Sequence, residues 1–131
     1  MVEQTSFDLL EYRLKGLRSM STIWVTTQVP GFHYWSEAPD SVSFLKNEHR
    51  HLFHIRLFVD VEHDDRDVEF FTLKTELESY LKMKFGIPAY FGQKSCEMIA
   101  RCISEYFEAG GYNVASVEVS EDGENGAIVY E

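Results

Sequence analysis

The chain has 131 residues, of which 44% are hydrophobic and 15% aromatic. This length and composition suit one ordinary domain with one packed core. Twenty-two acidic residues stand against 12 basic ones, so the formal net charge is −10, and a field of that sign repels phosphate backbones and anionic membrane surfaces. The sequence has no apolar run of membrane-spanning length, and its first stretch mixes charged residues where a signal peptide needs an apolar segment. We therefore expect a cytoplasmic protein with neither nucleic acid nor a membrane as partner.

The chain divides into a short extension and a single domain. Residues 1–20 mix apolar and charged side chains in a pattern that suits a short amphipathic helix, and residues 21–131 form the expected domain. Cys96 and Cys102 lie six residues apart in a segment with helical spacing, which turns them about 120° away from each other. We therefore expect no disulfide bond between them.

The first half of the domain predicts two strands. Residues 21–34 are rich in the β-branched and aromatic side chains that strands favour, and residues 37–41 are typical of a loop. The clearest strand covers residues 49–61, where apolar side chains alternate with others at period two. One face of this strand is therefore expected to lie against the core.

Two helices are predicted next. Apolar residues recur with helical spacing from Val68 to Phe85, and Gly86-Ile87-Pro88 ends the pattern. Ser95 is a suitable N-cap for a second helix, which carries Glu97 and stops at Gly110-Gly111. The residues expected on the buried stripes are Phe70, Phe71, Leu73, Leu77, Tyr80, Leu81 and Phe85 on the first helix, and Met98, Ile99, Cys102, Ile103 and Phe107 on the second.

Two short strands are predicted at the end of the chain, over residues 112–120 and 127–130, with a turn over residues 121–126. The order ββααββ predicts an α+β fold, in which two helices cover one face of a four-stranded, largely antiparallel sheet. The short terminal strands suggest exposed edges, and because such edges commonly pair between subunits, we expect a homo-oligomer. A ferredoxin-like or other α+β domain with incidental histidines is the alternative.

Three histidines are candidate metal ligands. His49 and His51 are separated by one residue in a predicted strand, so both side chains leave the same face of the sheet. His33 ends the preceding strand, and a neighbouring place in the sheet would bring it to the same site. Three imidazoles leave one position of a zinc ion open for water or a substrate oxygen, as in catalytic zinc sites. A chance His-x-His is the alternative, and His54 and His63 are interpreted as surface residues.

A resemblance to a known family rests on four segments in the same order. The run Asn47 to Leu57 resembles the His-Gly-His motif and alternating strand of the 6-pyruvoyl-tetrahydropterin synthase and 6-carboxytetrahydropterin synthase family. Residues Phe70 to Lys74 resemble the family's Asp-Phe-x-x-Leu-Lys helix start, and Ser95 to Ala100 resemble its Thr-Ser-Glu-Asn-Leu-Ala helix opening. Residues Val117 to Glu121 resemble the strand that ends in its pterin-anchoring glutamate.

The resemblance implies the family's T-fold for nearly the whole predicted domain, and it implies roles for five residues. His33, which precedes His49 by a gap similar to that in the family, would bind Zn²⁺ together with His49 and His51. Glu121 would hold a pterin-like ring through two hydrogen bonds, and Glu97 would join it in binding the substrate. A solvated carboxylate in a turn is the alternative interpretation of Glu121.

The chain departs from the family where the family's lyases transfer protons. Those lyases use a cysteine a few residues before the histidine pair and an Asp-His relay between the helices. Here Leu45 stands four positions before the pair, and residues 86–93 contain neither Asp nor His. Arg50 also replaces the small glycine. Cys96 or Cys102 is a possible substitute proton carrier, although a cysteine buried in a helix is more often inert.

Two functions of different classes follow. The first is a zinc-dependent carbon–oxygen lyase acting on a dihydropterin triphosphate, in which the metal polarises side-chain oxygens and Glu121 anchors the ring. The second is a catalytically degenerate T-fold protein that binds a pterin or purine-like ligand or serves as an assembly module, since losing general acid–base catalysis removes roughly 10²–10⁴ in rate. The acidic field disfavours a polyphosphate ligand unless a cluster such as Lys46, Arg50 and Arg56 overcomes it.

Overall fold

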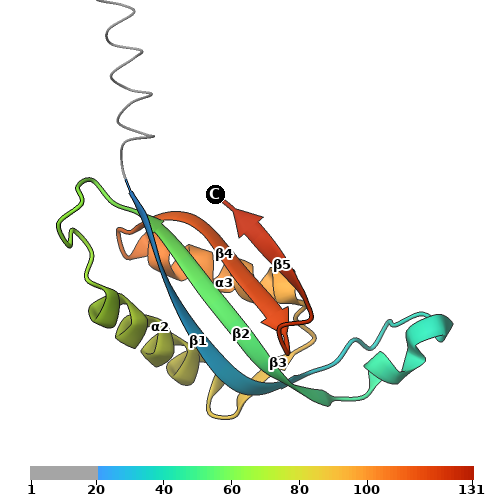
Figure 1. Cartoon of the computed structure of the whole chain (residues 1–131). Coiled ribbons are helices and arrows are strands. Elements are labelled where there is room, and N and C mark those ends of the chain that lie inside the picture. The colour runs from blue at the N-terminus through green and yellow to red at the C-terminus, as the bar shows by residue number, and fades with distance from the viewer. Residues whose placement is uncertain (1–20) are drawn as a thin grey trace, which may run out of the picture.

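A five-stranded sheet and two long helices dominate residues 21–131, the part of the chain that this computed structural model describes (Figure 1). The expected extension over residues 1–20 lies outside the described residues. In chain order the elements are β1 (Thr22–His33), the 3₁₀ helix η1 (Asp40–Lys46), β2 (His49–Asp60), α2 (Phe70–Phe85), β3 (Ala89–Gly92), α3 (Cys96–Ala109), β4 (Asn113–Glu121) and β5 (Asn125–Tyr130). Neither α2 nor α3 is long and apolar enough to cross a membrane, and the same holds for any other helix of residues 21–131.

The sheet has the strand order β3-β1-β2-β4-β5. β1, β2, β4 and β5 are the four predicted strands, and they pair as antiparallel neighbours. β3 was not predicted, and it pairs in parallel with the end of β1. The prediction of a four-stranded antiparallel sheet was therefore wrong by one strand, because β3 has only four residues between two helices and is too short to show a period.

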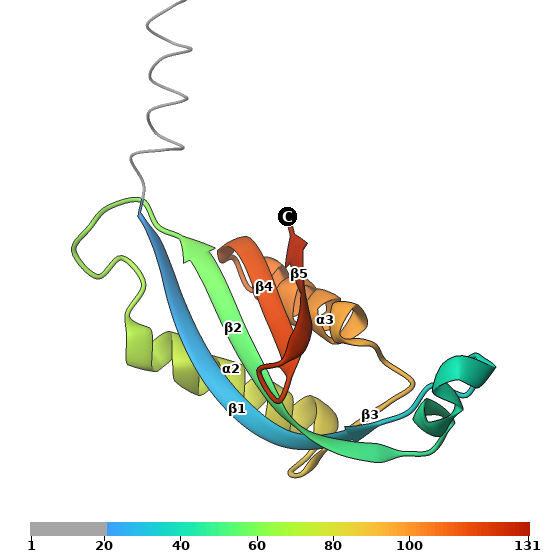
Figure 2. The same cartoon turned by 45° about the vertical axis from the view of Figure 1, so that its right-hand side comes forward.

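Both long helices cover the same face of the sheet, as predicted (Figures 1 and 2). α2 packs against β1 and β3, and α3 packs against β4 and β5. The face between them is filled by the alternating side chains of β2, of which Phe53, Ile55 and Leu57 are fully buried. Three side chains predicted to be buried, Phe70, Phe71 and Met98, are exposed instead.

The helical rotation explains why Phe71 and Met98 are exposed. Phe71 lies two residues before the buried Leu73, or about 200° round the helix, and Met98 is one residue and about 100° from the buried Ile99. Both therefore leave the stripe that faces the sheet. Phe70, in the first turn of α2, is also exposed.

The strand register sets the position of the histidines. β1 and β2 pair so that His33 lies opposite His49, and Gly31 lies opposite His51. These residues share the face that carries Phe53, so the row of buried side chains ends in imidazoles. The sheet thus delivers three histidine side chains to one end of its helix-covered face.

Candidate metal centre and adjoining pocket

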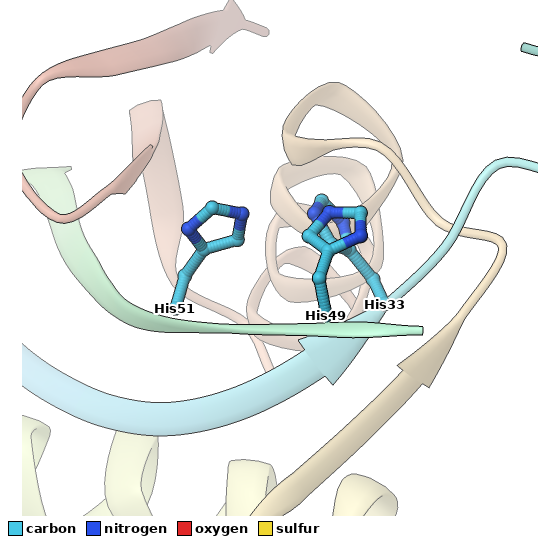
Figure 3. A group of neighbouring side chains, drawn as sticks. All are labelled: His33, His49 and His51. Carbon is cyan, nitrogen blue, oxygen red and sulfur yellow. The ribbon is translucent and has the colours of Figure 1, made fainter. Parts of the chain in front are cut away.

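Three imidazoles gather at the end of the hairpin formed by β1 and β2. Figure 3 shows the rings of His33, His49 and His51 rising from the same face of the two strands. Each ring offers one nitrogen atom such that these three atoms all lie within 4.8 Å of one another. His33 is the most enclosed of the three, with 7% of its surface exposed. The structure therefore brings together the three residues that the sequence singled out, and they could hold one metal ion.

Two of the rings are oriented by main-chain carbonyls. The Nδ1 atom of His33 lies 3.0 Å from the carbonyl oxygen of Lys94, in the loop before α3. The Nδ1 atom of His49 lies 2.8 Å from the carbonyl oxygen of Asn47. Because a carbonyl oxygen only accepts hydrogen bonds, both Nδ1 atoms must carry the proton, and in the neutral rings both Nε2 atoms carry a lone pair.

The third ring is oriented by a side chain. The Nδ1 atom of His51 lies 2.8 Å from Oδ2 of Asp122, the first residue of the turn between β4 and β5. The other carboxylate oxygen of Asp122 accepts a hydrogen bond of 2.9 Å from the main-chain N–H of Leu52. The hydrogen bond from the Leu52 N–H, which has the larger effect, and the one from His51 hold the pKa of Asp122 below its usual value. An ionised Asp122 can only accept, so the His51 Nε2 atom also carries a lone pair when the ring is neutral.

The Nε2 atoms of all three rings are buried and have no hydrogen-bond partner. A buried polar atom without a partner costs of the order of 1–3 kcal/mol, so three at one place need an explanation. A single metal ion bound there would accept all three lone pairs. Neutral imidazoles whose Nδ1–H groups are held by carbonyl or carboxylate oxygens are the ligands that Zn²⁺ binds in proteins, and the residues therefore fit zinc.

The carboxylate of Glu121 lies against this cluster. Its Oε2 is 3.1 Å from Nε2 of His33, and its Oε1 is 3.7 Å from Nε2 of His51. Burial lowers the pKa of His33, and although the Lys94 carbonyl and Glu121 raise it, the net direction is down. A carboxylate oxygen facing the lone pair of a neutral imidazole is repelled unless a cation lies between them. The position of Glu121 is thus a second sign of a cation site.

An aromatic side chain forms the floor of the cluster. Phe53 is fully buried, and its ring centroid lies 5.2 Å from that of His33 and 5.6 Å from that of His51. Phe91 of β3 packs against it with a centroid separation of 4.8 Å. Gly31 allows this packing, because a Cβ atom there would stand 2.8 Å from the Phe91 ring and 3.1 Å from the Phe53 ring. The floor excludes water and keeps the imidazoles in a medium of low dielectric constant.

A pocket of about 520 Å³ opens beside the cluster, within the range of small-molecule sites. It lies between the loop after β1, the first turn of α3, the end of β4 and the start of β5. Glu97, expected to bind substrate, and Glu121 both line it. The other lining residues that bear on function are His33, His49, Leu45, Lys94 and Cys96.

Leu45 and Cys96 bear on proton transfer. Leu45 lines the pocket with an aliphatic side chain, which cannot carry a proton. Burial raises the pKa of Cys96 to about 12, and the carboxylates of Glu121 and Glu97 act in the same direction. Such a thiol stays protonated at neutral pH and is a poor base. Cys96 and Cys102 are both free thiols, as predicted.

Other charged residues lie away from the pocket. The cations considered for a polyphosphate, Lys46, Arg50 and Arg56, are not among the residues that line the pocket. Arg56 lies on the uncovered face of the sheet, 5.2 Å from the centre of the Trp24 ring. His54 lies on that uncovered face too and stays outside the metal cluster, as predicted.

Comparisons with known proteins place the fold. The structure superimposes on 6-pyruvoyl tetrahydropterin synthase from Caenorhabditis elegans with a TM-score of 0.63 and 13% identity, covering 86% of this chain and 96% of that one. It also matches an uncharacterized protein from Wolinella succinogenes with a TM-score of 0.59 and 11% identity, over 86% and 98% of the two chains. No protein-family model and no curated protein matches the sequence. The described residues thus have a tetrahydropterin synthase-like fold, in agreement with the resemblance seen in the sequence.

Proposed function

We propose that this chain is a zinc-dependent lyase similar to 6-pyruvoyl-tetrahydropterin synthase and 6-carboxytetrahydropterin synthase, acting on a dihydropterin triphosphate in the cytoplasm. The observation that carries the proposal is the convergence of three histidines beside a pocket, each with a buried Nε2 atom that has no hydrogen-bond partner. His33, His49 and His51 are the proposed zinc ligands. The similarity of fold to a tetrahydropterin synthase supports the pterin as ligand.

The residues of the pocket divide the work of binding. Zinc bound there would act as a Lewis acid on an oxygen of the ligand side chain. Glu121 is proposed to accept two N–H donors of the pterin ring, and Glu97 to bind the same ligand from the first turn of α3. The main-chain carbonyls of Lys94 and Asn47 keep two of the imidazoles in the tautomer that offers Nε2 to the metal.

A second candidate function is ligand binding without catalysis. Leu45 favours it, because an aliphatic side chain lines the pocket close in sequence to the place of the family's cysteine. Cys96 is a poor replacement, since its raised pKa disfavours the thiolate. In this case the zinc site and the carboxylates would hold a pterin or purine-like ring, and no turnover would follow.

Open sheet edges support a homo-oligomer. Within residues 21–131, β1 pairs with β3 only from Gly31 to His33, so the edge from Thr22 to Pro30 has no neighbouring strand. β5 forms the other edge of the sheet. Two exposed edges on one sheet are suited to pair between copies of the chain. We expect light scattering to give a mass that is a multiple of 15.2 kDa, and a monomer would contradict this part of the proposal.

Metal analysis of the purified protein tests the zinc site. About one zinc per chain is expected in the wild type, and much less in His49→Ala, which removes a ligand. His54→Ala is the matched control, since it removes an imidazole from the same strand on the opposite face. Zinc content that is equal in the wild type and His49→Ala would refute the ligand assignment. Incubation of the zinc-loaded protein with dihydropterin triphosphates then separates the lyase, which releases product, from the binding protein, which retains its ligand unchanged.

A further inference from the structure

Asp122 is tied to the sheet from two directions. Its main-chain N–H donates to the carbonyl oxygen of Leu52 at 2.8 Å, and its Oδ1 accepts from the N–H of Leu52 at 2.9 Å. This reciprocal pair fixes the carboxylate, and Oδ2 is left to accept from Nδ1 of His51 at 2.8 Å. The backbone of Asp122 has a φ of 58°, in the left-handed region that Asp and Asn tolerate better than other residues with a side chain.

Asp122 differs from the groups that hold the other two rings. His33 and His49 are held by main-chain carbonyl oxygens, which no substitution removes directly. His51 depends on one side chain, which comes from a distant part of the sequence and a different pair of strands. The orientation of one of the three candidate metal ligands therefore depends on a single residue.

We propose that Asp122 is a positioning residue of the metal centre, which sets the tautomer of His51 so that its Nε2 lone pair faces the metal. The proposal rests on the proposed zinc site. Asp122 would not itself bind the metal, because its two oxygens already accept hydrogen bonds from His51 and Leu52. A carboxylate in this position fixes the ring and makes it a better ligand, and loss of such a partner typically weakens metal binding by about 10–100-fold.

The fixed position of the carboxylate makes Asp122→Asn a sharp test. The Asn oxygen must face the Leu52 N–H, since the opposite orientation would set two donors against each other. The amide NH₂ group then points at Nδ1 of His51 and donates to it. This forces the proton onto Nε2, where it blocks the metal. Asp122→Ala removes the acceptor but leaves His51 free to adopt either tautomer.

The two variants should therefore rank in opposite ways for the stability of the metal-free protein and for zinc affinity. Asn suits the left-handed backbone better than Ala, so the metal-free Asp122→Asn protein should keep more of its stability. Its zinc affinity should nevertheless fall further, by about 100-fold against about 10-fold for Asp122→Ala. If residue 122 only supported the turn, the variant that lost more stability would also lose more zinc affinity.

The experiment measures zinc affinity by competition with a chelator, thermal stability of the metal-free proteins, and the histidine tautomers by ¹⁵N NMR. Glu124→Gln, in the same turn, is the matched control for charge and should bind zinc as the wild type does. In metal-free wild type, His51 should carry its proton on Nδ1, and in Asp122→Asn on Nε2. Zinc affinity of Asp122→Asn within about twofold of the wild type, or an unchanged His51 tautomer, would overturn the proposal.

These readouts separate failure of this inference from failure of the zinc site. A wild type that binds no zinc refutes the proposed function, whereas a wild type that binds zinc with no loss in Asp122→Asn refutes only the role of Asp122. The tautomer measurement needs no metal. Should Asp122→Ala fail to fold, Asp122→Asn still decides the question alone.

Discussion

Zinc should raise the thermal stability of the protein by a predictable amount. In the metal-free fold, three Nε2 atoms are buried without a partner, and each costs of the order of 1–3 kcal/mol. A ligand that binds only the folded state stabilises it by about 2.7 kcal/mol at a free concentration 100 times its Kd. For a chain of this length, 1 kcal/mol moves Tm by about 3–5 °C. Zinc at that concentration is therefore expected to raise Tm by about 8–14 °C.

Differential scanning calorimetry of the EDTA-treated protein, with and without buffered zinc, measures this shift. His49→Ala leaves two imidazole ligands and should lose most of the shift. His54→Ala removes an imidazole from the same strand on the other face and should keep all of it. Equal shifts in these two variants would mean that zinc stabilises the protein from another place, and no shift in the wild type would refute the interpretation of the buried Nε2 atoms.

Three further substitutions and conditions test the site. Burial lowers the pKa of His33, so near pH 6.5 the unfolded chain takes up a proton more readily than the folded chain does. The free energy of unfolding of the metal-free protein, measured in urea, should therefore decrease as the pH falls below about 6.5, and this decrease should be smaller in His33→Gln. Gly31→Ala should cost about 1–3 kcal/mol in urea unfolding, because its Cβ atom would crowd the rings of Phe91 and Phe53; an unchanged midpoint would contradict the packing argument. Glu121→Gln replaces an acceptor by a donor and should weaken dihydropterin binding by at least about tenfold in calorimetry, with about one zinc per chain retained; equal ligand affinity would remove Glu121 as the ring anchor.

The long elements were predictable because each shows its own period. The strand predicted over residues 49–61 is β2 (His49–Asp60), and the helix predicted to end at Phe85 is α2, which ends there. Ser95 caps α3 as predicted, accepting a hydrogen bond from the Met98 N–H. η1 (Asp40–Lys46) was not predicted, because none of its residues is buried and it therefore has no apolar stripe.

Only part of the candidate site could be predicted from the sequence. His49 and His51 could be paired because residues at i and i+2 of a strand share a face, and the hairpin register then supplies His33. The carbonyl acceptors of Lys94 and Asn47 leave no trace in a sequence, since every residue has the same main-chain oxygen. Asp122 was missed because its role depends on a left-handed backbone and on pairing with Leu52, neither of which a pattern shows.

The net charge of the pocket depends on whether a metal is bound, and it bears on which kind of ligand the pocket can bind. Lys94 is the single cationic side chain among its lining residues, and Glu97 and Glu121 are the acidic ones, so with neutral histidines the charge is 1 − 2 = −1. A bound Zn²⁺ would change this to −1 + 2 = +1. Because the chain as a whole carries −10, a metal-free pocket repels a triphosphate, and only the metal-loaded pocket has a local field that opposes the repulsion. We therefore expect a phosphorylated ligand to bind only after zinc has bound, whereas an uncharged ring that binds through Glu121 should not need zinc.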